Sequence, residues 1–184
     1  MKKIIALSLV ALVAMSFKLA DGKKYFTKTG NITFFSKTDA ENIEGVNHKV
    51  TSAFETTSGK LQFSVLMKAF EFEKALMQEH FNENYVESDK FPKASFDGKF
   101  DNVAAINFTK DGTYQTTVSG KLTIKDKTNT VSVPGTVTVK GTSVNTKATF
   151  KILLADYNVS IPSVVKDKIN KEIEIRVDMD YKPM

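Results

Sequence analysis

The sequence predicts an all-β domain of about eight antiparallel strands, with one short helix inserted between two of them. Two observations support this fold class. Apolar residues recur at every second position through most of the chain, which is the period of a strand with one buried face. Short turn-like segments separate these stretches, as expected where antiparallel strands are joined directly. A β-sandwich and a closed barrel both satisfy this pattern.

The N-terminus has the pattern of an export signal. Two lysines precede the apolar stretch IIALSLVALVAMSF, and small residues follow where a signal peptidase would cut. The stretch is shorter than the ~20 apolar residues that span a bilayer. We therefore expect residues 1–20 to be a signal peptide cleaved near 16–20. Residues 21–184 would then form one domain that is periplasmic or secreted and has no membrane-spanning segment.

Composition excludes several classes of function. The chain has no cysteine, which excludes disulfides, thiolate metal sites and a cysteine nucleophile. Its formal net charge is +5, but the lysines are spread along the chain rather than gathered into a basic patch with interleaved aromatics. We therefore expect no nucleic-acid partner. Without disulfides, the fold must depend on its hydrophobic core.

The strands predicted before the helix have their apolar residues on one face. These residues are Ile32 and Phe34, then Val46, His48, Val50, Ser52 and Phe54, then Leu61, Phe63, Val65 and Met67. The segment TTSG separates the second stretch from the third as a turn. Because His48 falls in an apolar register, we expect a partly buried, hydrogen-bonded imidazole there rather than a general base.

A short inserted helix is predicted in the block of residues 76–92, which interrupts the strand alternation. Leu76, Met77, His80 and Phe81 form one stripe of a short helix, with Phe72 one turn earlier. Pro92 then keeps the preceding residue out of helical geometry, so the chain must straighten before the next strand. A helix with an apolar stripe between two barrel strands would lie over one opening. The sequence therefore predicts a lid.

The strands predicted after the helix continue the alternation. Their apolar faces are Ala94, Phe96, Gly98 and Phe100; Tyr114, Thr116, Val118, Gly120, Leu122 and Ile124; Val131, Val133, Val137 and Val139; Val144, Thr146, Ala148, Phe150 and Ile152; and Ile169, Ile173, Ile175, Val177, Met179 and Tyr181. The dipeptide Asp111-Gly112 is a strong hairpin signal between the first two of these strands.

No sequence motif indicates catalysis. A zincin helix needs two histidines four residues apart, but Asn84 stands where the partner of His80 would be. Glu79, His80 and Glu83 could share a metal, although polar residues on an exposed helix end explain them better. The Gly-x-Ser-x-Gly elbow and the phosphate-binding glycine motifs do not occur. A catalytic pair of carboxylates, as in glycoside hydrolases, stays open as a possibility, because the distance between two carboxylates depends on the fold. We predict no catalytic residue, no metal and no cofactor.

Three segments, taken in order, carry a resemblance to a known family. They are LMQEHFNENYVESDKFPKASFDGKF, VSGKLTIKDKTNTVSVP and FKILLADYNVSIP. From about residue 25 to the C-terminus, the chain resembles the YceI-like family of bacterial periplasmic lipid-binding proteins. The resemblance implies a lipocalin-like, eight-stranded antiparallel barrel whose pore holds an isoprenoid chain or another long amphiphile. It implies no catalytic residue.

The expected function is non-enzymatic binding of a long-chain isoprenoid or related lipid in the barrel. The predicted ligand-binding residues are those on the inner faces of the strands and on the helix stripe. They are Phe63, Val65, Met67, Phe72, Leu76, Met77, His80, Phe81, Tyr85, Phe96, Phe100, Leu122, Phe150 and Ile175. We expect His80, Glu83 and Tyr85 to hold a head group at the mouth, because a few polar groups fix orientation in such sites.

Two alternatives stay open at this point. A barrel filled by its own side chains would be a ligand-free structural or stress-related envelope protein, and the chain's fourteen phenylalanines could fill such an interior. A hydrolase acting on a lipid or a sugar is the second alternative. A homodimer is the one protein partner that we keep open.

Overall fold

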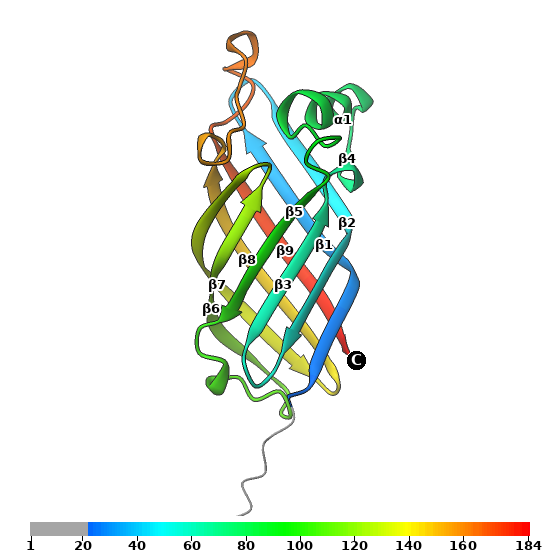
Figure 1. Ribbon diagram of the computed structural model, residues 1–184, viewed down its shortest axis with the longest axis vertical. Coiled ribbons are helices and arrows are strands. Elements are labelled where there is room, and N and C mark those ends of the chain that lie inside the picture. Colours follow the sequence, from blue (N-terminus) through cyan, green and yellow to red (C-terminus); the bar gives the residue numbers. More distant parts are fainter. Residues whose placement is uncertain (1–21) are drawn as a thin grey trace, which may run out of the picture.

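The computed structural model describes residues 22–184 (Figure 1). The predicted signal peptide lies outside these residues. The described chain forms one sheet of nine strands. The strands are β1 (Lys24–Lys37), β2 (Asn42–Glu55), β3 (Lys60–Leu66), β4 (Glu71–Phe72), β5 (Lys93–Phe100), β6 (Gly112–Ile124), β7 (Lys127–Lys140), β8 (Ser143–Leu153) and β9 (Glu172–Pro183). The helical segments are η1 (Met67–Ala69), α1 (Ala75–His80), the π-helical turn η2 (Phe81–Tyr85), η3 (Val103–Ala105), η4 (Leu154–Tyr157) and η5 (Ser163–Val165).

The long strands close into a barrel. Their order around it is β1-β9-β8-β7-β6-β5-β3-β2, and the pairing of β1 with β2 joins the two ends of the sheet. Every pairing is antiparallel, and the two-residue β4 adds to β2 at one rim. The prediction of an eight-stranded antiparallel barrel with a short helix is confirmed, and the sandwich is excluded. The pairing of β7 with β8 covers only the part from Gly135↔Ala148 to Lys140↔Ser143, so these two strands are not paired in the upper half of the barrel.

The two rims of the barrel differ. At the upper rim in Figure 1, α1 lies on one side and the long β8–β9 connection, residues 154–171, rises on the other. The last strand begins at Glu172, so the prediction that Ile169 belongs to it is wrong. At the lower rim lie the β5–β6 connection and the C-terminal end of β9. Asp111 ends that connection rather than forming a two-residue hairpin.

Strands β1 and β2 each carry one extra residue. Thr27 pairs with Ser52, Gly30 pairs with Val50, and Ile32 pairs with Asn47, so the register shifts once in each strand. Beyond such a bulge, side chains point to the opposite face of the sheet from the one that simple alternation predicts. Gly30 lets the Met179 side chain pack against the backbone here, because a Cβ at this position would lie 2.0 Å from the Sδ of Met179.

The bulge in β2 overturns the prediction for His48. Asn47 is buried, whereas the next residue, His48, faces solvent. The imidazole Nδ1 lies 2.6 Å from the Asn31 Oδ1, so the expected hydrogen bond is present on the outer surface. The expected partial burial is wrong.

The lower half of the barrel is filled by its own side chains. Tyr25 stacks on Phe54 with ring centroids 4.9 Å apart, and the Tyr181 ring meets Phe54 edge-on at 4.9 Å. Aliphatic residues complete this packed half: Val50, Val137, Val139, Val144 and Met179, all at most 2% exposed. The aromatic contacts have the offset and edge-to-face geometries that ring quadrupoles favour. This part of the interior contains the main hydrophobic core.

One polar chain crosses the filled half. Ser52 Oγ donates to the carbonyl oxygen of Gln62 at 2.8 Å and lies 2.7 Å from the Tyr181 Oη. Since the serine has given its only proton to the carbonyl, the tyrosine hydroxyl donates to Ser52. Burial raises the pKa of Tyr181 well above its ordinary value, so the phenol stays protonated.

Candidate functional site

The upper half of the barrel encloses a cavity of about 550 Å³. This size falls within the usual range for small-molecule sites. Exposed residues of the upper rim, including Leu76, His80 and Lys168, are part of its lining, so the cavity opens at the α1 end. The interior is therefore hollow above and filled below.

All fourteen residues predicted on the inner strand faces and on the lid line this cavity, whereas Glu83, which was also expected to hold a head group, does not. The lining contains Phe63, Val65, Met67, Phe72, Leu76, Met77, His80, Phe81, Tyr85, Phe96, Phe100, Leu122, Phe150 and Ile175. The strand residues among them were predicted from the alternation of apolar residues, and the others from the helix that covers the opening. The structure brings them together around one space; their role in binding stays a prediction.

Sequence reasoning missed part of the lining. Strands β1 and β7 contribute Ile32, Phe34, Val131 and Val133, and the β8–β9 connection contributes Tyr157, Val159, Val165 and Ile169. The residues of β1 and β7 follow a clear alternation, so the sequence could have predicted them as part of the lining. The residues of the connection follow neither a strand nor a helix period, so only the run of apolar residues in VSIPSVV could have indicated them.

Four phenylalanines fix the lid on the rim. The Phe81 ring, at the junction of α1 and η2, lies 5.1 Å from Phe72, 5.4 Å from Phe34 and 5.5 Å from Phe70. Gly45 on β2 leaves room for this group, because a Cβ there would lie 2.4 Å from the Phe34 ring. The lid is thus held by aromatic contacts with β1 and the η1–β4 segment.

The outer side of the lid carries the polar residues. His80 and Glu83 are exposed, and the cavity lining includes His80 but not Glu83. Within residues 22–184, no group of three His, Cys, Asp or Glu side chains is placed to hold a metal ion. A metal site at Glu79, His80 and Glu83 is therefore not supported. Tyr85 points to the cavity, and burial raises its pKa, so its hydroxyl is a hydrogen-bond donor at neutral pH.

A pair of glycines shapes the wall below the lid. Gly98 on β5 pairs with Gly120 on β6, and the Phe96 ring lies across both. A Cβ on Gly98 would lie 2.4 Å from the Phe96 Cζ, and one on Gly120 would lie 2.7 Å from it. The ring therefore lies close against the wall and leaves the centre of the barrel open. An aromatic ring over a sheet glycine also protects its backbone.

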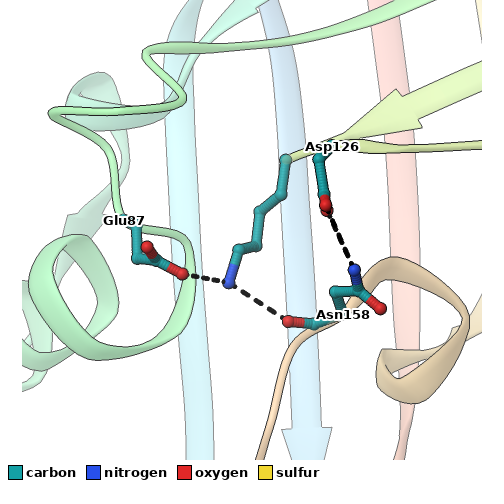
Figure 2. Close-up of polar contacts among 4 residues, drawn as sticks. Glu87, Asp126 and Asn158 are labelled. Carbon is teal, nitrogen blue, oxygen red and sulfur yellow. Dashed lines mark hydrogen bonds and ion pairs between the residues drawn. The ribbon is translucent and has the colours of Figure 1, made fainter.

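Three connections of the upper rim meet in a polar cluster, which we call the Lys125 clasp (Figure 2). It consists of Glu87, Lys125, Asp126 and Asn158. The Lys125 Nζ, on the side chain drawn without a label, lies 2.6 Å from the Glu87 Oε1 and donates to the Asn158 carbonyl oxygen at 3.1 Å. Asn158 Nδ2 donates to both carboxylate oxygens of Asp126, at 3.1 and 3.2 Å.

The clasp is built on unusual backbone geometry. Glu87, Lys125 and Asn158 have φ values of +49°, +53° and +55°, in the left-handed region that non-glycine residues seldom adopt. The Lys125 side chain is only 8% exposed. Its hydrogen bond lowers the pKa of Glu87 and keeps that carboxylate charged. The clasp thus ties the end of the lid to the β6–β7 hairpin and to the β8–β9 connection.

Together these features define a class of protein: a closed antiparallel barrel with an apolar cavity that opens at one rim beside a helical lid. The chain belongs to the YceI-like domain family, whose sequence profile matches residues 23–181. None of the curated proteins compared with the chain matched it. No helix among residues 22–184 is long and apolar enough to cross a membrane.

Solved structures show the same fold. A polyisoprenoid binding domain from Saccharophagus degradans, implicated in plant cell wall breakdown, superposes with a TM-score of 0.77 at 13% identity, covering 88% of this chain and 98% of that one. Burkholderia cenocepacia BcnA gives a TM-score of 0.69 at 20% identity, covering 82% and 95%. The Campylobacter jejuni YCEI protein gives 0.55 at 12% identity, covering 100% and 99%.

Proposed function

We propose that this protein binds a long-chain isoprenoid or a related amphiphilic lipid in the barrel cavity, without changing it chemically. The observation that carries the proposal is the cavity itself, about 550 Å³ of space walled mostly by aromatic and aliphatic side chains. The ligand class named for the Saccharophagus degradans domain supports this assignment. We further propose that the protein acts after export, in the periplasm or outside the cell.

The arrangement of polar groups suits a lipid with its head at the mouth. The upper rim contributes several polar residues to the lining: Lys74, His80 and Lys168, which are exposed, and Glu41 and Tyr85, which are half-buried. An apolar tail would therefore lie between the strands while the head group meets these residues and water. A small number of placed polar groups is enough to orient such a ligand.

Burial of a long tail gives a free energy of the same order as the cost of association. Each buried CH₂ contributes ~0.8 kcal/mol, so ~15 carbons give on the order of 10 kcal/mol. Association costs about 4 to 15 kcal/mol, which offsets much of that gain. Long chains are therefore expected to bind usefully and short chains weakly. This dependence on length distinguishes a lipid carrier from a protein that binds only a polar head group.

The tyrosines of the cavity are suited to donating hydrogen bonds to a ligand. Tyr85 and Tyr157 both line it, and burial raises the pKa of each. Both hydroxyls therefore remain protonated at neutral pH and act as donors rather than as bases.

Organic extraction of the purified protein, followed by mass spectrometry, tests the proposal. We expect a long-chain lipid to be recovered. The delipidated protein should then bind isoprenoid alcohols of about 15 to about 40 carbons, more tightly as the chain lengthens until the cavity is full. Recovery of no lipid, together with no binding of any alcohol in this series, would leave the ligand-free structural role as the better explanation. Conversion of a bound lipid to a product would instead support the hydrolase.

A further inference from the structure

The β8–β9 connection ends in an exposed apolar tip. We call residues 163–171 the rim tip. Figure 1 shows the β8–β9 connection rising above the rest of the upper rim. Val164, in η5, is 87% exposed, more than Leu76 at 59% or Leu153 at 48%. An aliphatic side chain left this open gains nothing from the fold of its own chain.

The rim tip is continuous with the cavity. Val165, the next residue, lines the cavity, and so do Lys168 and Ile169. Across the mouth, Leu76 on α1 lines the cavity and is also 59% exposed. The mouth therefore lies between two apolar edges, of which the rim tip projects further.

The rim tip is also basic. It contains Lys166, Lys168 and Lys171 against a single acid, Asp167, and all four are exposed. None of these lysines forms an ion pair with any residue in the described part of the chain. An apolar residue that projects among unpaired lysines is the arrangement by which peripheral proteins attach to anionic bilayers.

We propose that the rim tip docks the protein on an anionic lipid bilayer, with Val164 inserted among the head groups and the lysines against them. This inference rests on the proposed function and adds the surface from which the lipid is taken or to which it is given. Docking would place the cavity mouth against the bilayer, so that a tail moves between the two without crossing water. The helix side carries Glu73, Glu79 and Glu83, so the barrel would tilt with the rim tip toward the bilayer.

Co-sedimentation with vesicles tests this docking on the full mature chain. We expect binding to vesicles containing phosphatidylglycerol, weaker binding to pure phosphatidylcholine, and loss of binding as salt screens the lysines. Val164→Asp should weaken vesicle binding at least tenfold. The double variant Lys166→Gln/Lys171→Gln should weaken it about fivefold for each lysine removed.

Matched controls lie at the opposite rim. Met184 is 81% exposed at that rim, and Lys99 and Lys140 are also exposed there. The variants Met184→Asp and Lys99→Gln/Lys140→Gln therefore make the same chemical changes away from the mouth. Both should leave vesicle binding unchanged. Equal losses in the controls and in the rim-tip variants would overturn the proposal in favour of a nonspecific charge effect.

Two further measurements separate the docking from the proposed function. Val164 is not part of the cavity lining, so Val164→Asp should bind the isoprenoid alcohols as the wild type does. A wild type that binds the alcohols but ignores the vesicles would overturn the docking and leave the proposed function standing. Sedimentation velocity tests whether the rim tip instead contacts a second copy of the chain. If Val164→Asp dissociates a dimer without affecting vesicle binding, the rim tip contacts a second copy, and the inference is wrong.

Discussion

Filling the cavity at Ala148 should limit the length of tail that the protein accepts. Ala148 lies on β8, where it pairs with Gly135 of β7 and Val177 of β9, and all three line the cavity. The substitution Ala148→Leu places three more carbons in this space. We expect them to displace about two to three CH₂ groups of a long tail, at ~0.8 kcal/mol each. The loss of about 1.6 to 2.4 kcal/mol corresponds to affinity weakened on the order of 15- to 60-fold.

The assay is a binding series with isoprenoid alcohols of increasing length. For Ala148→Leu, affinity should stop rising at a shorter chain than in the wild type, while the shortest alcohols bind equally well. Thr149→Leu is the matched control, because the neighbouring residue is exposed on the outside of the same strand. Thermal unfolding should show no loss of stability, since the leucine enters open space. An equal loss at every chain length, or no loss at any length, would refute a tail bound between the strands.

Three other substitutions test the parts of the barrel around the cavity. Phe81→Ala removes the central ring of the lid contacts and should lower the free energy of unfolding by about 2 to 3 kcal/mol, measured in urea, and speed the release of bound lipid. Tyr181→Phe removes a buried hydroxyl from the filled half and should cost about 1 kcal/mol in the same urea assay, while alcohol binding is unchanged. Because Lys125 holds the pKa of Glu87 below its ordinary value of 4.5, the clasp stabilises the fold above that pH and loses this contribution as the pH falls below it. Glu87→Gln should therefore remove part of the fall in thermal stability below about pH 4.5, whereas Glu83→Gln should not. The same acid sensitivity in wild type and Glu87→Gln would show that the clasp does not contribute.

The regular part of the barrel could be predicted because a half-buried strand imposes a period of two on its sequence. Phe96, Leu122, Phe150 and Ile175 each stand in an unbroken alternation, and each faces the cavity. The helix stripe was equally readable, since its spacing fits one face of a helix. These local patterns were sufficient to predict which residues would surround the cavity.

The bulges could not be predicted, because their cause is distant in sequence. Gly30 brings the backbone close to Met179, a residue of the last strand, and the shift that follows turns His48 outward. Alternation alone assigns His48 to the same face as Val50. One extra residue in the strand reverses that assignment.

The Lys125 clasp could not be predicted from the sequence for a related reason. Glu87, Lys125 and Asn158 belong to three different connections, and they meet only when the barrel has closed. Among these three residues only Asn158 is of a type that often adopts positive φ, so the sequence gives little sign of this backbone geometry. The β8–β9 connection was missed as part of the cavity because its apolar residues have no regular period.

The aromatic packing around Phe54 has a consequence for how cargo would move. The lower half of the barrel is packed with side chains, so the cavity does not continue to the lower rim. A lipid that enters tail-first at the upper rim would therefore have to leave without passing through the lower rim, and no second molecule could push it out from below. Unloading at the upper rim would require an acceptor that binds the head group there, and the depth of the packed half would set how much of the tail is kept out of water.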